Sequence, residues 1–243
     1  MILLLRKELM QMENNLRQVQ ENYARIQDAI AEAAVKSGRT PEDISFMAVT
    51  KTVAPELVNT AIDCGIRLLG ENRVQEYQSK KEAYRQGIPV DFIGTLQSNK
   101  VKYLIGNIRM IQSVNKLSLA QEIERVAAKQ NIRQDILLEV NIGGEDSKSG
   151  TAPEYLPELL EQVSQMPHVH VCGLMTIPPP SESTRFLEAM QELFLKTKDL
   201  QIPDTDMNIL SMGMSDDYAQ AIQYGSNLVR IGSALFGARN YQK

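Results

Sequence analysis

The sequence predicts an α/β fold, a (β/α)8 TIM barrel with an extra N-terminal helix. The chain has 243 residues, of which 43% are hydrophobic, so it can bury a substantial core and is not disordered throughout. Eight short apolar runs alternate with amphipathic stretches, and runs that are apolar on both faces are typical of parallel strands. Eight βα units in roughly 200–250 residues indicate a barrel. A doubly wound open sheet is the alternative, but it usually has fewer strands.

The first predicted element is a helix over residues 12–37. Its apolar residues recur at spacings of three and four, which places them on one helix face. Gly38 and Pro41 follow and are typical of a helix end. Docking of this helix onto the barrel is favoured over a short coiled coil. The apolar run 2–5 is too short for a secretory or membrane segment. Because Met10 or Met12 could equally be the translation start, residues 1–11 are interpreted as an N-terminal extension without a structural role.

The remaining elements follow in regular alternation. Predicted strands span residues 44–50, 66–70, 90–94, 110–113, 136–142, 169–175, 208–212 and 228–231. A helix is expected after each of the first seven strands, over residues 55–64, 72–84, 98–105, 116–130, 153–165, 183–199 and 216–224. No Gly/Ser-rich linker divides the chain, and the Pro-rich stretch 178–180 falls in one loop. Residues 12–243 are therefore predicted to form a single domain.

Charge and composition exclude several classes of protein. Against 26 basic residues stand 30 acidic ones, which gives a net charge of −4. A mildly acidic chain without Trp lacks the basic surface and stacking platforms of a nucleic-acid binder. Cys64 and Cys172 are far apart inside apolar segments, so buried, reduced thiols in a cytoplasmic protein are expected.

The chemistry of a barrel lies at the C-terminal ends of its strands. After the seventh and eighth strands, Gly/Ser turns lead into helix starts, an arrangement that directs backbone N–H groups at a phosphate. The phosphate candidates are Ser211, Gly213, Ser215, Gly232 and Ser233. For Ser215 the alternative is plain N-capping of the next helix, with Asp216 and Asp217 complementing the helix dipole.

Lys51 ends the first predicted strand. By itself a lysine at a strand end is usually a solvated charge. In a barrel mouth, however, burial frees its amine for Schiff-base formation. An amine near a phosphate site fits a phosphorylated aldehyde. Lys148 is the reserve candidate, because its loop opens on the same side of the barrel.

The sequence offers few residues for metal binding, nucleotide binding or nucleophilic catalysis. His168 and His170 begin the sixth predicted strand, at the wrong end for barrel catalysis. As metal ligands they need a third partner that the sequence does not offer at a recognisable spacing, so a structural role is favoured and no metal is predicted. Walker, dinucleotide-binding and nucleophile-elbow motifs are absent. Methionines near the mouth indicate pocket packing.

Seven motifs, in order along the chain, resemble one known family, the pyridoxal phosphate homeostasis proteins. They are AVTKT at 48–52, GENRVQE at 70–76, FIG at 92–94 with LQSNK at 96–100, SKSG at 147–150, GLM at 173–175, LSMGMSDD at 210–217, and VRIGSA at 229–234 with FGAR at 236–239. The resemblance runs from Asn15 to Tyr241, nearly the whole chain.

The resemblance implies a barrel like the alanine racemase N-terminal domain that holds pyridoxal 5′-phosphate (PLP) as a Schiff base on Lys51. It implies that Asn72 lies beside the cofactor ring and that Arg230 faces the pyridine nitrogen. The residues implied to bind phosphate are Ser211, Gly232 and Ser233, followed by Met212 and Ser215. The sequence departs from the family at Asp91, where the family often carries His.

The implied role is intracellular vitamin B6 homeostasis without robust catalysis, with no catalytic residue assigned. PLP-dependent apo-enzymes are the expected recipients, and a monomer is expected. A PLP-dependent amino-acid racemase is the alternative. It needs a second acid/base group opposite Lys51, which barrel racemases take from a separate C-terminal β domain that is not expected here. A Schiff-base aldolase is disfavoured because its lysine usually lies on a later strand.

Overall fold

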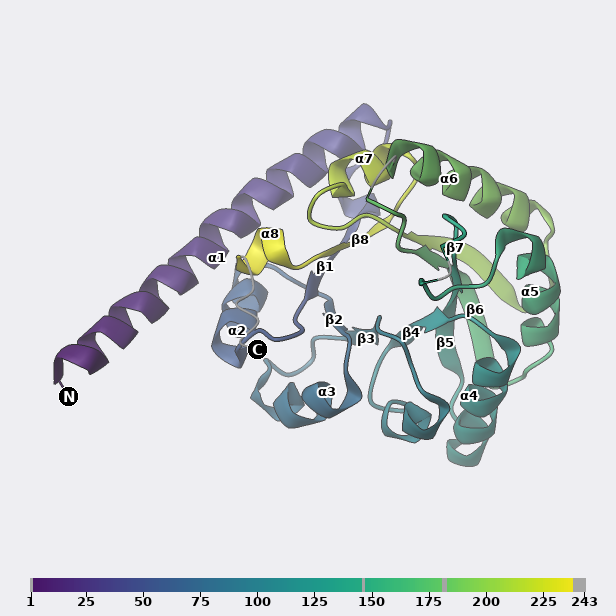
Figure 1. Ribbon diagram of the computed structural model, residues 1–243, viewed down its shortest axis with the longest axis horizontal. Coiled ribbons are helices and arrows are strands. Elements are labelled where there is room, and N and C mark those ends of the chain that lie inside the picture. The colour runs from purple at the N-terminus through teal and green to yellow at the C-terminus, as the bar shows by residue number, and fades with distance from the viewer. Residues whose placement is uncertain (1, 146, 181–182, 238–243) are drawn as a thin grey trace.

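Eight parallel strands close into a barrel in the order in which they occur along the chain (Figure 1). The computed structural model describes residues 2–145, 147–180 and 183–237, so the last residues of the predicted domain, with Arg239 and Tyr241, lie outside the described part. The strands are β1 (Ser45–Val49), β2 (Leu69–Glu71), β3 (Val90–Phe92), β4 (Met110–Val114), β5 (Gln134–Val140), β6 (Val169–Thr176), β7 (Thr205–Ser211) and β8 (Leu228–Ile231). The predicted TIM barrel is confirmed.

The helices form a ring outside the strands (Figure 1). They are α1 (Ile2–Lys36), α2 (Pro55–Cys64), α3 (Val74–Lys80), α4 (Leu117–Gln130), α5 (Leu156–Ser164), α6 (Ser183–Asp199), α7 (Tyr218–Gln223) and α8 (Ser233–Phe236). The helix predicted after the third strand is instead a 3-10 helix, Ser98–Tyr103. Its N-cap residue Gln97 makes no side-chain capping bond, and short 3-10 segments commonly serve as connectors. The short α8 lies where a helix start was expected after the eighth strand, although no range was predicted for it.

Helix α1 is longer than predicted, because it begins at Ile2 and so includes most of the segment 1–11. Beyond the barrel its N-terminal half extends away from the other elements (Figure 1). Its C-terminal half buries one face, through Val19, Ile26 and Ile30, and contacts α2, α7 and α8. Docking onto the barrel is therefore confirmed for this half. Gly38 follows it with a φ of +72°, as expected for a helix-ending glycine.

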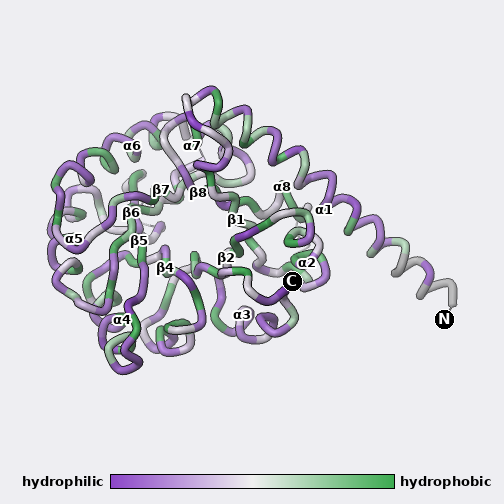
Figure 2. The backbone as a smooth tube through the Cα atoms, turned by 180° about the vertical axis from the view of Figure 1, so that it is seen from behind, coloured by the Kyte–Doolittle hydropathy of each residue, from purple (hydrophilic) through white to green (hydrophobic). Residues whose placement is uncertain are grey.

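Apolar side chains fill two layers, one between strands and helices and one inside the barrel. Hydrophilic and hydrophobic residues alternate along the outer helices (Figure 2), as one buried helix face requires. Inside the barrel, Met47, Leu137, Met175 and Leu228 are buried. Among the described helices, none combines the length and apolar composition that crossing a membrane requires.

Candidate functional site

A cavity of about 190 Å³ lies at the C-terminal ends of the strands. Its wall includes six of the eight predicted site residues, which are Lys51, Asn72, Ser215, Arg230, Gly232 and Ser233. The other two, Ser211 and Met212, are buried beneath it and do not line it. The exposed Lys148 does not line it either. The two predicted glycine-rich loops and the lysine after β1 therefore meet at one place.

Lys51 sits in a turn that α3 holds in place. The backbone N–H of Thr52, which has a φ of +58°, donates to the carboxylate of Glu76. Lys80 pairs with the same carboxylate, and its ammonium group donates to the Val53 carbonyl at 2.8 Å. This arrangement fixes the backbone on the C-terminal side of Lys51.

Asn72 reaches the cavity because a glycine, Gly94, follows β3. A Cβ atom at Gly94 would lie 2.2 Å from the backbone oxygen of Asn72, so only glycine permits this approach of the two strand ends. The Asn72 side-chain oxygen is buried and has no hydrogen-bond partner among the described residues. A cavity wall with an unsatisfied acceptor is suited to a ligand that brings a donor.

The loops after β7 and β8 are joined through Ser215. Its hydroxyl accepts hydrogen bonds from the backbone N–H groups of Gly232 at 3.3 Å and Ala234 at 3.1 Å. The N-cap of α7 is Asp217, whose carboxylate accepts from the Met214 N–H at 2.6 Å. Plain capping of α7 by Ser215 is therefore excluded. Two backbone donors instead converge on one oxygen position at the edge of the cavity.

Arg230 forms the floor of the cavity, with only 4% of its surface exposed. Its guanidinium donates to the Ser211 hydroxyl at 2.7 Å and to the Thr176 carbonyl at 2.8 Å. Burial lowers the pKa of Arg230 to about 10, against the opposing effect of Asp217 and Glu139. Arg230 is therefore still charged at neutral pH, and its hydrogen-bond partners in these two contacts are neutral.

Below Arg230, a chain of polar side chains crosses the barrel interior. The Ser211 hydroxyl donates to Gln112 at 2.7 Å, and the Gln112 amide donates to Asp91 at 2.6 Å. Arg109 closes the chain with two hydrogen bonds to Asp91, at 2.8 and 2.6 Å. Sequence reasoning missed Gln112, although a glutamine inside the apolar run 110–114 is a signal for an interior polar contact.

The polar chain bears on two residues that the sequence analysis singled out, Ser211 and Asp91. Ser211 contacts Arg230 and Gln112 and does not reach the cavity, so its hydroxyl orients Arg230. Asp91 is the middle residue of β3, and its side chain bonds to Gln112 and Arg109 without lining the cavity. The departure from the family's usual His at this position therefore falls outside the cavity wall.

A second buried carboxyl group lies behind the Lys51 turn. Glu71 accepts hydrogen bonds from the hydroxyls of Thr50 and Tyr84, both at 2.7 Å and both on the same oxygen. Its other oxygen has no partner within the described part of the chain. Burial raises the pKa of Glu71, and the two donated hydrogen bonds compensate only in part.

The raised pKa of Glu71 makes the stability of the folded protein depend on pH. A carboxyl group whose folded-state pKa is raised stabilises the folded protein fully below its unfolded pKa, near 4.5, and loses that contribution as the pH rises through the folded value. We expect Glu71→Gln to reduce the loss of unfolding free energy between pH 5 and pH 8, by about 1.4 kcal/mol for each tenfold difference in proton affinity between the folded and the unfolded protein. Urea unfolding of the cofactor-free protein at both pH values measures it. The exposed Glu154→Gln is the control, and parallel profiles for Glu71→Gln and wild type would contradict the prediction.

At the other end of the barrel lie the two histidines. The His168 ring contacts the Glu124 carboxylate at 2.8 Å, and the His168 backbone N–H donates to it at 2.8 Å. This pairing ties the start of β6 to α4 and agrees with the predicted structural role. Cys172 is buried, as expected, whereas Cys64 is only half-buried, because it ends α2 near the surface. The two cysteines are not paired in a disulfide.

The chain is similar to known proteins over nearly its whole length. Residues 11–240 match the family model described as alanine racemase, N-terminal domain. A pyridoxal phosphate homeostasis protein of Aquifex aeolicus is 43% identical over 91% of this chain and 98% of its own length. The protein of the same name from Escherichia coli K12 is 36% identical over 93% and 98%. The structure of PipY from Synechococcus elongatus with PLP bound is 30% identical and covers 86% of this chain and 100% of that one, with a TM-score of 0.72.

Proposed function

We propose that this chain, which belongs to the family of pyridoxal phosphate homeostasis proteins, binds PLP in the barrel-mouth cavity and serves homeostasis of the cofactor. The observation that carries the proposal is the combination of groups around this one cavity. A lysine, two converging backbone donors and a buried arginine line it together.

The proposed attachment residue is Lys51. When bound, the cofactor supplies an aldehyde that condenses reversibly with a primary amine. Lys51 is the lysine on the cavity wall among the described residues, and its turn is held by the Glu76 contact with Thr52. A fixed backbone limits the positions that the amine can take, which favours one attachment geometry.

The proposed phosphate site is formed by the loops after β7 and β8. Two N–H groups, from Gly232 and Ala234, already converge on the Ser215 oxygen. A phosphate oxygen is a stronger acceptor than a hydroxyl, so these donors suit it, with Ser233 at the start of α8 beside them. Asp216 also lines the cavity, and it has to point away from a bound dianion.

The proposed contact of the pyridine nitrogen is Arg230. A guanidinium can only donate hydrogen bonds, so a ring nitrogen that faces it must accept and stays unprotonated. An unprotonated ring withdraws electrons less strongly, which discourages carbanion chemistry. The contacts of Arg230 with Ser211 and Thr176 hold it in this position. The unpaired Asn72 oxygen offers an acceptor to the phenolic hydroxyl of the cofactor.

These roles favour a carrier over an enzyme. Racemisation needs acid/base groups on both faces of the bound substrate. Among the described residues on the cavity wall there is no His or Tyr to face Lys51. We further propose that the protein acts as a monomer in the cytoplasm and supplies PLP-dependent apo-enzymes. The racemase alternative rests on the match to the alanine racemase N-terminal domain.

The experiment that tests binding is borohydride reduction of the purified protein, followed by digestion and mass spectrometry. We expect one pyridoxyl group per chain, on the peptide that contains Lys51. A protein that takes up no reducible PLP would refute the proposed function.

The absence of robust catalysis needs a separate test. Steady-state assays with both enantiomers of alanine, serine and glutamate should show at most trace proton exchange, because the cavity offers a single amine. A turnover number on the order of 1 s⁻¹, at the low end for ordinary enzymes, would instead support the racemase alternative.

A further inference from the structure

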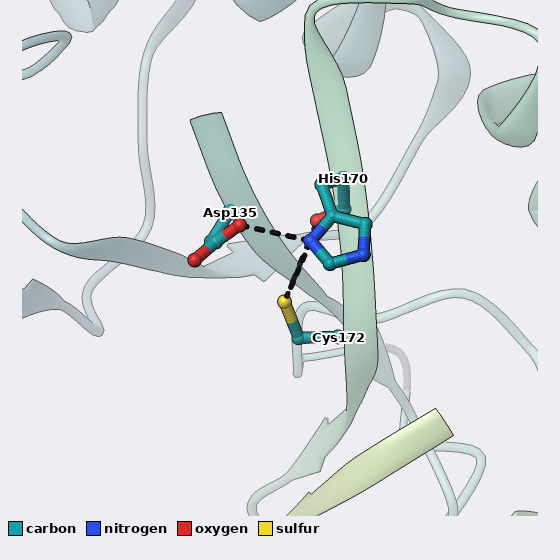
Figure 3. Close-up of side chains that lie close together, drawn as sticks. All are labelled: Asp135, His170 and Cys172. Carbon is teal, nitrogen blue, oxygen red and sulfur yellow. Dashed lines mark hydrogen bonds and ion pairs between the residues drawn. The ribbon is translucent and has the colours of Figure 1, made fainter. Parts of the chain in front are cut away.

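The N-terminal end of the barrel holds a cluster of metal-ligating side chains that the proposed function does not use. Asp135 of β5 pairs directly with His170 of β6 in the strand register. Cys172 lies at an irregularity of β6, where the pairing with β5 shifts between Val171 and Gly173, and its sulfur lies beside the His170 ring. Figure 3 shows that Asp135 and Cys172 both approach the same ring nitrogen of His170.

The distances within this cluster resemble those between metal ligands. The His170 Nδ1 atom lies 3.0 Å from the Asp135 carboxylate and 3.4 Å from the Cys172 sulfur. The three ligand atoms lie within 4.8 Å of one another. Around a tetrahedral zinc ion, O, N and S ligands are about 3.3–3.6 Å apart, from bond lengths of about 2.0–2.3 Å. The Asp135 side chain is 42% exposed and has room for the remaining adjustment.

The other nitrogen of His170 is held as in known metal sites. Nε2 lies 3.2 Å from the Asp206 carboxylate of β7. A carboxylate in this position accepts the Nε2 proton and leaves Nδ1 with a lone pair that faces Asp135 and Cys172. Without a cation, the Cys172 thiol can donate its proton to this lone pair or to the Asp135 carboxylate, and a bound metal ion would take the place of that proton. The alternative is a protonated His170 shared between the two aspartates.

The geometry points to a Zn²⁺ site at the N-terminal end of the barrel, with Asp135, His170 and Cys172 as ligands and Asp206 orienting the imidazole. The set of one carboxylate, one imidazole and one thiolate suits zinc. Three protein ligands leave a fourth position for water, which can enter past the half-exposed Asp135.

The charges of the site balance. Binding of Zn²⁺ displaces the thiol proton of Cys172 to solvent, against the burial and the Asp135 charge that raise the Cys172 pKa to about 12. Two positive charges then meet the carboxylate and the thiolate. The neighbouring Arg109 is already bound to Asp91 by two hydrogen bonds, so its charge is neutralised.

Titration with Co²⁺ alone tests the site, because cobalt replaces zinc and reports its ligands by colour. The full-length protein, with its cofactor and after chelator treatment, should bind one Co²⁺ per chain. We expect a sulfur-to-cobalt charge-transfer band and the intense visible bands of tetrahedral cobalt, both removed by added Zn²⁺. A wild-type protein that shows neither band would overturn the proposal in favour of the protonated histidine.

Variants assign the ligands. Cys172→Ala should lose the charge-transfer band, whereas Cys64→Ala, at the other cysteine, should keep it. Asp206→Asn should weaken binding by about 10–100-fold, and Asp204→Asn, the same change at an exposed position nearby, should not. Asp135→Asn alters a half-exposed side chain and tests the site even if Cys172→Ala does not fold. Unchanged cobalt spectra in both Cys172→Ala and Asp135→Asn would refute the site.

Discussion

Lys51→Ala is expected to leave the purified protein colourless and without a borohydride-reducible adduct. The amine of Lys51 is the proposed point of attachment, and no other lysine among the described residues lines the cavity. The side chain is only half-buried, so its removal should leave the circular dichroism spectrum and the unfolding midpoint nearly unchanged. Absorbance after incubation with PLP, together with mass spectrometry after reduction, measures the loss.

Two control variants separate the roles of charge and amine. Lys51→Arg keeps the positive charge but offers no amine that condenses, so it should bind PLP weakly and form no adduct. Lys148→Ala removes an exposed lysine outside the cavity and should retain the full adduct. An adduct that persists in Lys51→Ala and maps to Lys148 would overturn the assignment.

The second large effect is expected at Arg230. In the wild-type protein the pyridine nitrogen should be unprotonated, because a guanidinium offers only donors. Arg230→Glu places an acceptor there and should convert the ring to the pyridinium form. Nitrogen NMR with isotope-labelled PLP measures this change directly, and the visible spectrum should shift with it. A protonated ring in the wild-type protein would refute the proposed role of Arg230.

A matched variant keeps this experiment interpretable. Arg230→Gln removes the charge but keeps a donor, so the ring nitrogen should remain an acceptor. In both variants the Ser211 hydroxyl and the Thr176 carbonyl lose the hydrogen bonds that Arg230 donates. Each buried acceptor left without a donor costs about 1–3 kcal/mol of stability. The unfolding midpoint of both variants should therefore fall, whereas only Arg230→Glu should change ring protonation.

Much of the fold was predictable from local patterns. The bounds of α2, α6 and β8 were predicted as the structure has them, because Pro55 marks a helix start and periodic apolar residues mark the rest. β2 was placed too early. Ile66 is buried, but pairing with β1 begins only at Leu69, opposite Ala48. An apolar run shows burial, whereas the extent of a strand depends on its neighbours.

Site residues were predictable where they lie in a strand or directly after one. Lys51 follows β1 and Arg230 lies in β8, and parallel strands of a barrel end at the same mouth. The contact of Ser211 with Gln112 was not predictable, since it spans 99 residues. The meeting of Asp135 with His170 also depends on the register between β5 and β6, which no local spacing encodes.

The polar chain through the barrel bears on how sequences of this family diverge. Asp91 and Gln112 are buried and bonded to each other, and Arg109 reaches Asp91 from an exposed position. A buried carboxylate that loses its partners destabilises the fold, whereas joint replacement of the bonded groups by apolar residues can be neutral. Substitutions at these three positions should therefore be accepted together and rejected singly. In relatives with His at position 91, we expect the residues equivalent to Arg109 and Gln112 to have changed as well, so that the three positions covary across the family.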